Sequence, residues 1–385
     1  MRQNFLVFGS PQIEEADIDE VAKVLRSKWL GTGPKVAEFE RRFAAYKGRS
    51  AAVALNSCTA ALHLSILALN LKPGDEVITT ALTFCATVNA IIHAGAVPVL
   101  ADVDPETMNL DPASVAATIT PRTRAILPVH FAGRPCEMDP LMALAHKHDL
   151  KIVEDCAHAI ETEYRGKKAG TIGNFGCFSF YVTKNLVTGE GGMVIGRDES
   201  ALDRLRILGL HGMSKDAWRR FGDTGYVHYK VVEAGFKYNM MDIQGALGLQ
   251  QLDRLEANWC RRMEIWDRYM RDFRNLPIGL PADPEPETRH GLHLFTVQID
   301  EGAAGISRDD FLGAMTSRKI GTGVHYLSLG EHPFYQERFG WRPEDQPNAM
   351  KIGRSTVSLP LSAALTDDDV ADVIAAVHDI LTTAR

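Results

Sequence analysis

Short apolar segments alternate with helical patterns through the first half of the chain. The apolar runs, which predict strands, lie at residues 51–55, 76–79, 97–103, 124–130 and 150–154. Apolar residues at helical spacing predict helices at residues 59–69, 86–94 and 140–148. Strands separated by helices of about 10 to 15 residues favour parallel strand–helix–strand units. We therefore expect an α/β domain whose mostly parallel sheet is covered by helices on both faces.

The second half of the chain begins with a different pattern. Short strand-like runs at 176–181 and 193–195 flank a glycine-rich turn at 188–192. A polar stretch follows at 212–230, and a loop of this length is uncommon in a compact domain unless it has a function. We expect this loop to contact a substrate or a partner.

A long helical pattern then leads into the C-terminal part. It runs from Asp242 to about Phe273, which corresponds to a helix on the order of 45 Å, and it ends in a proline-rich stretch. The remainder predicts a smaller α/β lobe, with strands at 292–299, 323–327 and 357–359 and helices at 307–318 and 367–381. We expect a large domain at residues 1–257 and a small C-terminal domain at residues 258–385.

Composition narrows the class of protein. The 385 residues are 45% hydrophobic and 24% charged, as in ordinary globular proteins, and the net charge of −7 argues against a nucleic-acid partner. The six cysteines lie far apart without a Cys-x-x-Cys pair, which favours reduced thiols over a disulfide scaffold or a zinc site. We find neither a signal-peptide pattern nor an apolar run of about 18 residues. These features predict a cytoplasmic protein without a membrane partner.

Two strand ends carry candidate chemical groups. The predicted strand 150–154 ends at Glu154 and is followed by Asp155. Ligands bind at the carboxyl ends of strands in open parallel sheets. These carboxylates are either site residues or a solvated strand end. Lys184 lies between the next apolar strand and the glycine-rich turn. It is either a surface lysine or a partly desolvated amine suited to forming an imine; taken alone, the surface interpretation is favoured.

Two further strand–helix junctions favour a ligand. Between Asn56 and Ala61 a strand passes through small residues into a helix, so that backbone amides and the positive helix end could bind a phosphate. The alternative is an ordinary helix cap. Phe84 lies at a similar junction, where its ring could cover a planar ligand or pack in the core. A phosphate cradle, an aromatic ring, a carboxylate and a lysine together match the requirements of pyridoxal phosphate.

Several motifs resemble one known family. The chain is similar, from about residue 8 to its C-terminal helix, to the DegT/StrS family of sugar-nucleotide aminotransferases. The motifs that carry this resemblance are Gly33-Pro34, 57–62, 73–77, 95–98, Glu154-Asp155-Cys156-Ala157-His158, 178–185 and Glu190-Gly191-Gly192. Within the family the chain looks most like members that aminate a UDP-4-keto-pentose, through the stretches 235–239, 305–309 and 321–325. The resemblance implies a fold-type I aminotransferase with a mixed, mostly parallel sheet.

The resemblance also implies roles for residues around pyridoxal 5'-phosphate. Lys184 stands where the family binds the cofactor aldehyde as an imine, and Asp155 where the family pairs the pyridine nitrogen. Phe84 is at the position that stacks on the ring, and His158 is beside the cofactor. The residues implied at the phosphate are Cys58, Thr59, Ala60 and Ser179. Cys58 stands where many members have Gly.

Further implied features concern the assembly and the substrates. Asn239 matches an asparagine that reaches the phosphate of a neighbouring subunit, which implies a homodimer with shared active sites. The resemblance implies L-glutamate as the amino donor and a nucleotide-linked keto sugar as the acceptor. Candidate sugar contacts are His325, Lys215 and Arg219. The alternatives are a sugar dehydratase on the same cofactor, in which His replaces the lysine, and a non-catalytic regulator on the same fold.

Overall fold

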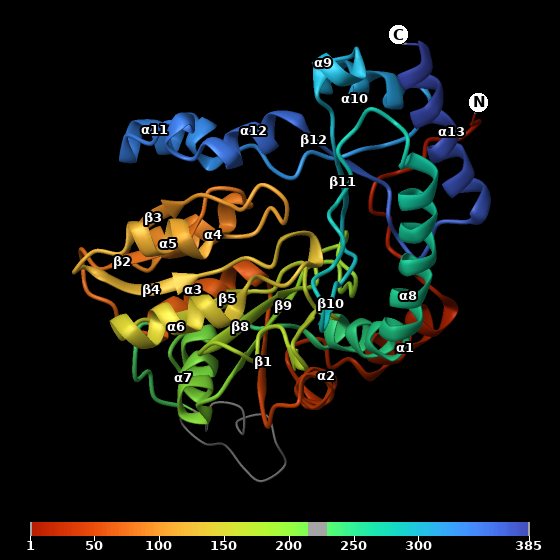
Figure 1. The fold of residues 1–385 in the computed structure, drawn as a ribbon. Coiled ribbons are helices and arrows are strands. Elements are labelled where there is room, and N and C mark those ends of the chain that lie inside the picture. Colours follow the sequence, from red (N-terminus) through yellow and green to blue (C-terminus); the bar gives the residue numbers. More distant parts are fainter. Residues whose placement is uncertain (1, 215–228, 384–385) are drawn as a thin grey trace.

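The computed structural model describes residues 2–214 and 229–383. Within these ranges, seven strands form a central sheet in the order β1-β9-β8-β5-β4-β2-β3 (Figure 1). The strands are β1 (Ala52–Leu55), β2 (Glu76–Thr80), β3 (Val97–Ala101), β4 (Thr123–Leu127), β5 (Lys151–Asp155), β8 (Phe175–Ser179) and β9 (Gly192–Gly196). β9 is antiparallel to both of its neighbours, and the other pairs are parallel. The prediction of a mixed, mostly parallel sheet is confirmed.

Helices cover both faces of this sheet. One layer holds α3 (Cys58–Ala68), α4 (Cys85–His93) and α7 (Glu199–Gly209). The other holds α2 (Pro34–Lys47), α5 (Pro112–Thr118), α6 (Met138–His148) and the first turns of α8 (Asp242–Phe273). Alternate residues of β1 face different layers: Val53 and Leu55 pack with α3, whereas Ala52 and Ala54 pack with α2. Because both faces are buried, the strands read as continuous apolar runs in the sequence.

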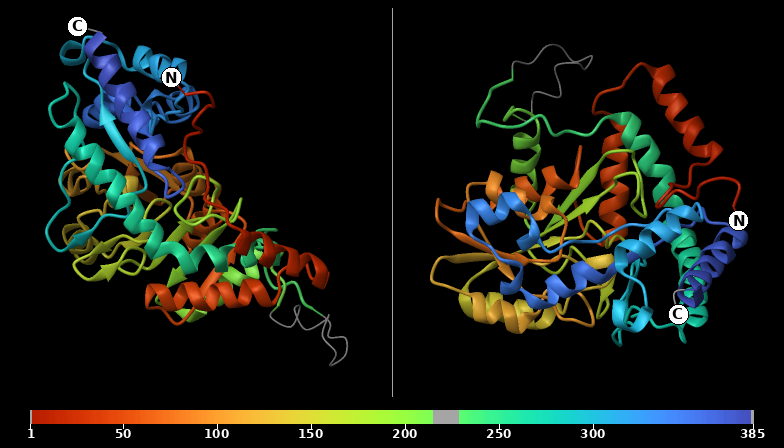
Figure 2. Two further views of the ribbon diagram at one scale, coloured as in Figure 1. Left: turned by 90° about the vertical axis from the view of Figure 1, so that its right-hand side faces the viewer. Right: turned by 90° about the horizontal axis from the view of Figure 1, so that it is seen from above.

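The C-terminal part forms a second core around the last turns of α8. These turns pack with β11 (Phe295–Gln298), β12 (Thr356–Leu359), α10 (Arg308–Ser317) and α13 (Asp367–Thr383). β11 and β12 pair in an antiparallel way. α1 (Glu15–Ser27) and α2 lie against the other end of α8, so α1 and α13 stand at opposite ends of the long helix (Figure 2). The boundary between residues 257 and 258 falls inside α8 and stays a prediction.

The prediction of a strand at 323–327 is wrong. Only Gly323 forms a bridge there, with Ser358 of β12. The segment instead crosses to the large domain, where the Leu329 amide donates to the carbonyl of Ala81 over 2.9 Å. Two helices follow that the sequence did not indicate, α11 (Pro333–Phe339) and α12 (Pro347–Ser355), and both pack on the large domain. Within the segment itself, Tyr326 packs against the large domain and its hydroxyl lies 3.1 Å from His158 Nε2, which explains why these residues do not continue as a strand.

Smaller elements complete the fold. A three-stranded sheet joins β6 (Glu163–Tyr164), β7 (Lys167–Lys168) and β10 (Thr288–Arg289), and α9 (Glu301–Ala304) precedes α10. All six cysteines are free, as their spacing predicts. Among the described helices, none is long and apolar enough to cross a membrane.

Candidate active site

A cavity of about 520 Å³ opens at the carboxyl ends of β5 and β8, where α3 and α4 begin. This volume falls in the range of small-molecule sites. The predicted site residues that line it are Cys58, Thr59, Phe84, Asp155, His158, Ser179, Lys184 and His325. These residues come from separate strand ends and loops, so the sheet brings together most of the residues predicted from the sequence.

The first turn of α3 forms an anion cradle in this cavity. The Ser57 hydroxyl caps the helix by accepting from the Ala60 amide at 3.1 Å. The Ala60 amide is thus hydrogen-bonded within the chain and Ala60 is not among the lining residues, so its role at the phosphate stays a prediction. Cys58 and Thr59 remain at the positive helix end. A Cβ on Gly192 would lie 2.4 Å from the Ser57 backbone, so β9 can approach the cradle only with glycine there.

Asp155 lies buried at the end of β5. Its carboxylate accepts from the Thr87 hydroxyl at 2.9 Å and from the Ala157 amide at 3.0 Å. Burial raises the pKa of Asp155 above its ordinary value, and these two hydrogen bonds and the nearby Lys184 amine reduce that rise. A cationic group bound here would favour the ionised carboxylate further. Thr87 is a site residue that the sequence analysis missed.

Lys184 follows β8 and presents its amine to the cavity. Burial lowers its pKa from 10.5 to about 8, although Cys58 and Asp155 oppose the shift. A pKa near 8 leaves about a tenth of the amine neutral at pH 7, against about 0.03% for an exposed lysine. Lys184 is half-buried and lines the cavity, so the surface interpretation is wrong. A lowered pKa suits an amine that acts as a nucleophile or base.

Phe84 forms one wall of the cavity. Its ring is 58% exposed, which is unusual for a phenylalanine and rules out the core-packing alternative. The ring lies 6.0 Å from the ring of Tyr326, centroid to centroid. An exposed aromatic face at this position is suited to stacking on a planar ligand.

Two histidines also line the cavity. His158 accepts from the Ala132 amide through Nδ1, at 3.2 Å, and its Nε2 lies 3.1 Å from the Tyr326 hydroxyl. His325 lies 2.8 Å from the Ser358 hydroxyl through Nδ1. Burial, with a smaller contribution from Lys184, lowers the pKa of His325 to about 4, so this side chain is neutral at physiological pH. It can offer a hydrogen bond to a polar ligand but not a positive charge.

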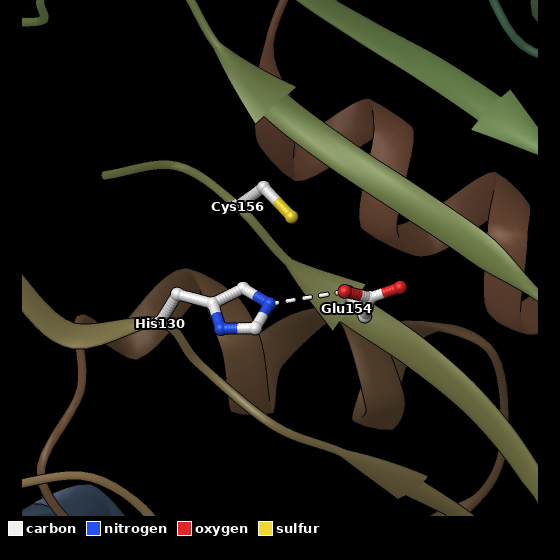
Figure 3. Close-up of side chains that lie close together, drawn as sticks. All are labelled: His130, Glu154 and Cys156. Atoms are coloured by element: carbon white, nitrogen blue, oxygen red, sulfur yellow. Dashed lines mark hydrogen bonds and ion pairs between the residues drawn. The ribbon is translucent and has the colours of Figure 1, made fainter. Parts of the chain in front are cut away.

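The Glu154 side chain does not line the cavity and instead forms hydrogen bonds within the protein. It is buried with His130 and Cys156, a combination that could suggest a metal site (Figure 3). The Cys136 amide donates to His130 Nδ1, so the Nε2 proton is directed at Glu154, 3.1 Å away. Three amides of the loop 170–173 fill the remaining acceptor positions of Glu154. The carboxylate therefore has no position left for a metal ion, and it anchors the loop.

A buried polar network holds the segment next to Lys184. The Asn185 amide group donates to Glu161 at 2.9 Å and to the carbonyl of Gly291 at 2.8 Å. Glu161, which is 0% exposed, forms an ion pair with Arg262 of α8, which is 3% exposed. The reactive lysine is thus placed by contacts with the loop before β11 and with the long helix, none of which was indicated by the sequence.

The remaining predicted residues lie elsewhere. Asn239 lines a different pocket of about 250 Å³ beside β1, where it donates to the Thr32 hydroxyl at 2.7 Å and accepts from the Lys237 amine at 2.6 Å. It does not line the Lys184 cavity of its own chain. Lys215 and Arg219 lie outside the described residues.

The cavity fits pyridoxal phosphate. Its helix-end cradle suits the phosphate, Phe84 suits the ring, Asp155 suits the pyridine nitrogen and Lys184 suits the aldehyde. With the mixed, mostly parallel sheet and its two helical layers, these features define a fold-type I aminotransferase that depends on pyridoxal phosphate.

Comparisons with known proteins identify the family. Residues 11–378 match the DegT/DnrJ/EryC1/StrS aminotransferase family, and the chain belongs to it. The chain is 48% identical over 381 residues to the spore coat polysaccharide biosynthesis protein SpsC of Bacillus subtilis (strain 168), covering 99% of this chain and 98% of SpsC.

Solved structures agree with this assignment. The pyridoxal-phosphate form of the putative sugar aminotransferase Spr1654 from Streptococcus pneumoniae has a TM-score of 0.92 and 33% identity, covering 99% of this chain and 100% of that one. PseC from Helicobacter pylori, an aminotransferase involved in the biosynthesis of pseudoaminic acid, has a TM-score of 0.91 and 27% identity, over 99% and 100% of the two chains. The protein is a sugar aminotransferase that uses pyridoxal phosphate.

Proposed function

We propose that this protein transfers the amino group of L-glutamate to the keto group of a nucleotide-linked sugar, with a UDP-4-keto sugar as the first candidate. The products are an amino sugar nucleotide and 2-oxoglutarate. The observation that carries the proposal is the placement of the Lys184 amine in one cavity with Asp155 and Phe84. The resemblance of residues 235–239 and 321–325 to enzymes that aminate UDP-4-keto-pentose supports the choice of sugar. We place the reaction in the cytoplasm, in a homodimer.

Lys184 is the proposed base and acid in both halves of the reaction. Pyridoxal phosphate, when bound, withdraws electrons from the Cα of the amino donor and so makes its proton acidic. The Lys184 Nζ atom then removes that proton and returns it on the adjacent carbon. Because burial lowers the pKa of Lys184 to about 8, the neutral amine is about 300 times more abundant at pH 7 than in an exposed lysine. The sugar half of the reaction uses the same transfer in reverse.

Asp155 is the proposed partner of the pyridine nitrogen. An ionised carboxylate at this point keeps that nitrogen protonated, and Thr87 and Ala157 orient the two carboxylate oxygens. Phe84 restricts the ring to one plane. Cys58 and Thr59 bind the phosphate through the end of α3, together with Ser179 at the end of β8.

The test uses a panel of nucleotide-linked keto sugars. We expect glutamate-dependent formation of 2-oxoglutarate with a UDP-4-keto sugar, and loss of this activity in Lys184→Ala with the fold retained. Product formation only with other carriers or other keto positions would refute the UDP-4-keto assignment, and substantial activity in Lys184→Ala would refute the role of the lysine.

The chain offers a matched control for Lys184. Lys47 is 2% exposed, and burial also lowers its pKa to about 8. Its amine donates to the carbonyl of Ile160 at 2.9 Å and lies 4.5 Å from the centre of the Phe178 ring, away from the cavity. We expect borohydride treatment of the cofactor-loaded protein to label Lys184 and not Lys47. Labelling of Lys47 would show that a lowered pKa is sufficient for a lysine to bind the cofactor, and that the position of Lys184 in the cavity is not required.

The dehydratase alternative predicts a different outcome. Glutamate added without sugar should remove the visible cofactor band of an aminotransferase. A dehydratase would instead eliminate water from the keto sugar. A regulator would show neither reaction. Bleaching of the band by glutamate therefore supports transamination, and a band that glutamate leaves unchanged contradicts it.

A further inference from the structure

An acidic side chain at the end of a sheet strand caps a helix of the C-terminal part. Asp102 comes directly after β3, and its carboxylate accepts from the backbone amides of Asn348 and Ala349, at 3.0 and 2.9 Å. These amides lie in the first turn of α12, where the preceding residue, Gln346, makes no capping hydrogen bond with its side chain. Because Pro347 has no amide hydrogen, Asp102 binds the first two amides that the helix presents. Its negative charge also interacts favourably with the N-terminal end of the helix dipole.

Further hydrogen bonds orient this contact. The side-chain amide of Asn348 donates to the carbonyl of Val103 at 2.9 Å. The Asp102 carboxylate accepts from the Val103 amide at 2.9 Å, and the Asp102 amide donates to the Ser114 hydroxyl of α5 at 2.8 Å. The carboxylate is therefore held by its own loop and by α5 as well as by α12.

The other end of α12 lies against a segment of the cavity wall, residues 325–329. His325 and Tyr326 of this segment line the cavity. A Cβ on Gly353 of α12 would lie 2.8 Å from the carbonyl oxygen of Tyr326 and 2.9 Å from the amide nitrogen of Ser328. The backbone of the helix and that of the segment are thus in direct contact, which glycine alone allows.

The segment 325–329 is held between α12 and the central sheet. The Leu329 amide donates to the carbonyl of Ala81, which follows β2, at 2.9 Å. Ala349 and Ile352 of α12 are buried in the same hydrophobic cluster as Leu329. The position of the segment therefore depends on how firmly α12 is attached to the sheet.

We propose that Asp102 is a positioning residue for the aminotransferase reaction, which fixes segment 325–329 by capping α12. Asp102 does not line the cavity, so it acts through the helix and not by touching a ligand. Without the cap, the first turn of α12 has two unbound amides, and the cavity wall formed by His325 and Tyr326 can leave its position. Only a fraction of the protein is then ready to bind a substrate, and the apparent affinity falls by that fraction. A bound substrate holds the wall in place, so the rate at saturation is retained.

The first experiment measures amide hydrogen exchange in the cofactor-loaded protein. The Leu329 amide is the reporter, because it exchanges only when segment 325–329 separates from Ala81. We expect Asp102→Ala to speed this exchange about fivefold, the factor that corresponds to the loss of one helix cap. Asp102→Asn keeps an acceptor oxygen and should restore most of the protection. Unchanged exchange of Leu329 in Asp102→Ala overturns the proposal.

The second experiment separates binding from turnover, with L-glutamate as the probe. The rate at which glutamate bleaches the cofactor band is measured against its concentration. We expect Asp102→Ala to raise the half-saturating concentration about fivefold and to change the limiting rate by less than twofold. A loss of stability alone would reduce the amount of protein that reacts and leave the half-saturating concentration unchanged, and that result overturns the proposal. This experiment rests on the proposed amino donor: a wild type that glutamate does not bleach refutes the donor, and the exchange of Leu329 still decides the role of Asp102.

Asp198→Ala is the matched control. Asp198 caps α7 by accepting from the Ser200 amide at 2.9 Å, and it does not line the cavity. This variant loses a cap of the same kind, and we expect it to match the wild type in Leu329 exchange and in half-saturation. Thermal unfolding of both variants measures their loss of stability separately. If Asp198→Ala changes both quantities as far as Asp102→Ala does, the effect is general destabilisation and the proposal fails.

Discussion

Replacing Thr87 by valine tests how the protein keeps Asp155 ionised. The change exchanges one hydroxyl for a methyl group of similar size and removes the hydrogen bond of 2.9 Å to the carboxylate. The Ala157 amide, at 3.0 Å, then remains as the other donor to Asp155. The Thr83 hydroxyl, 2.9 Å from that of Thr87, loses its acceptor but stays close to the cavity.

The size of the effect follows from the chemistry of this contact. A hydrogen bond to a charged group contributes about 1.5–3 kcal/mol, and one pH unit corresponds to about 1.4 kcal/mol. The pKa of Asp155, which burial already raises, should therefore rise by about one to two further pH units. The reaction needs the ionised form, so the acid limb of the pH profile moves to higher pH while the rate above the limb is retained.

The assay is the rate at which glutamate bleaches the visible cofactor band, measured across pH. Thr79→Val is the matched control, because the buried Thr79 hydroxyl donates to the carbonyl of Leu127 at 2.7 Å and Thr79 does not line the cavity. We expect Thr79→Val to lose stability without moving the limb. An acid limb in Thr87→Val that coincides with that of the wild type would refute the reasoning.

Three more predictions concern stability and assembly. Burial raises the pKa of Asp155 in the folded protein, so the stability of the fold falls as the pH rises through that pKa. Asp155→Asn cannot ionise, and without cofactor it should therefore have a higher Tm than the wild type at neutral pH and the same Tm in acid. The variant should also lack activity. Glu161→Ala leaves Arg262 buried without its partner, and denaturant unfolding should show a loss of about 3–5 kcal/mol. If Asn239 acts across a dimer interface, each mixed dimer of Lys184→Ala and Asn239→Ala subunits has one active site without either substitution. An equal mixture of the two inactive variants should then recover about a quarter of the wild-type activity. No recovery would place Asn239 outside a shared site.

Local patterns in the sequence were sufficient for much of the fold. Alternating strands and helices predicted the sheet, and helical spacing from Asp242 to Phe273 predicted α8, because each pattern reflects burial of a single element. Helices α2, α5 and α7 were missed, although Pro at the start of α2 and of α5 is a usual signal of a helix N-terminus. The strand at 323–327 was wrongly expected, since Tyr326 in this segment packs against the large domain.

The sequence likewise indicated some residues of the candidate site and not others. Asp155 and Lys184 could be named as candidates because one ends and the other follows an apolar strand, and the carboxyl ends of parallel strands converge on one edge of the sheet. Strand position alone left both residues open; their combination with a phosphate cradle and Phe84, and the family resemblance, favoured a cofactor site. The sequence could not separate Glu154 from Asp155; the structure does, because side chains alternate along a strand, so that Glu154 faces the loop 170–173 and Asp155 faces the cavity. The sequence also could not show which groups donate hydrogen bonds to each carboxylate.

The amino-acid sequence by itself determined the α/β alternation, the long helix and the two candidate groups at strand ends, Asp155 and Lys184. Only the tertiary structure decided which residues support those groups: Thr87 beside Asp155, Glu161 and Arg262 behind Asn185, and Tyr326 against His158. The physical reason is the separation of the contacting residues along the sequence. Periodicity shows whether a residue is buried in its own element, whereas a hydrogen bond between residues more than 20 positions apart forms only once separate elements have packed together.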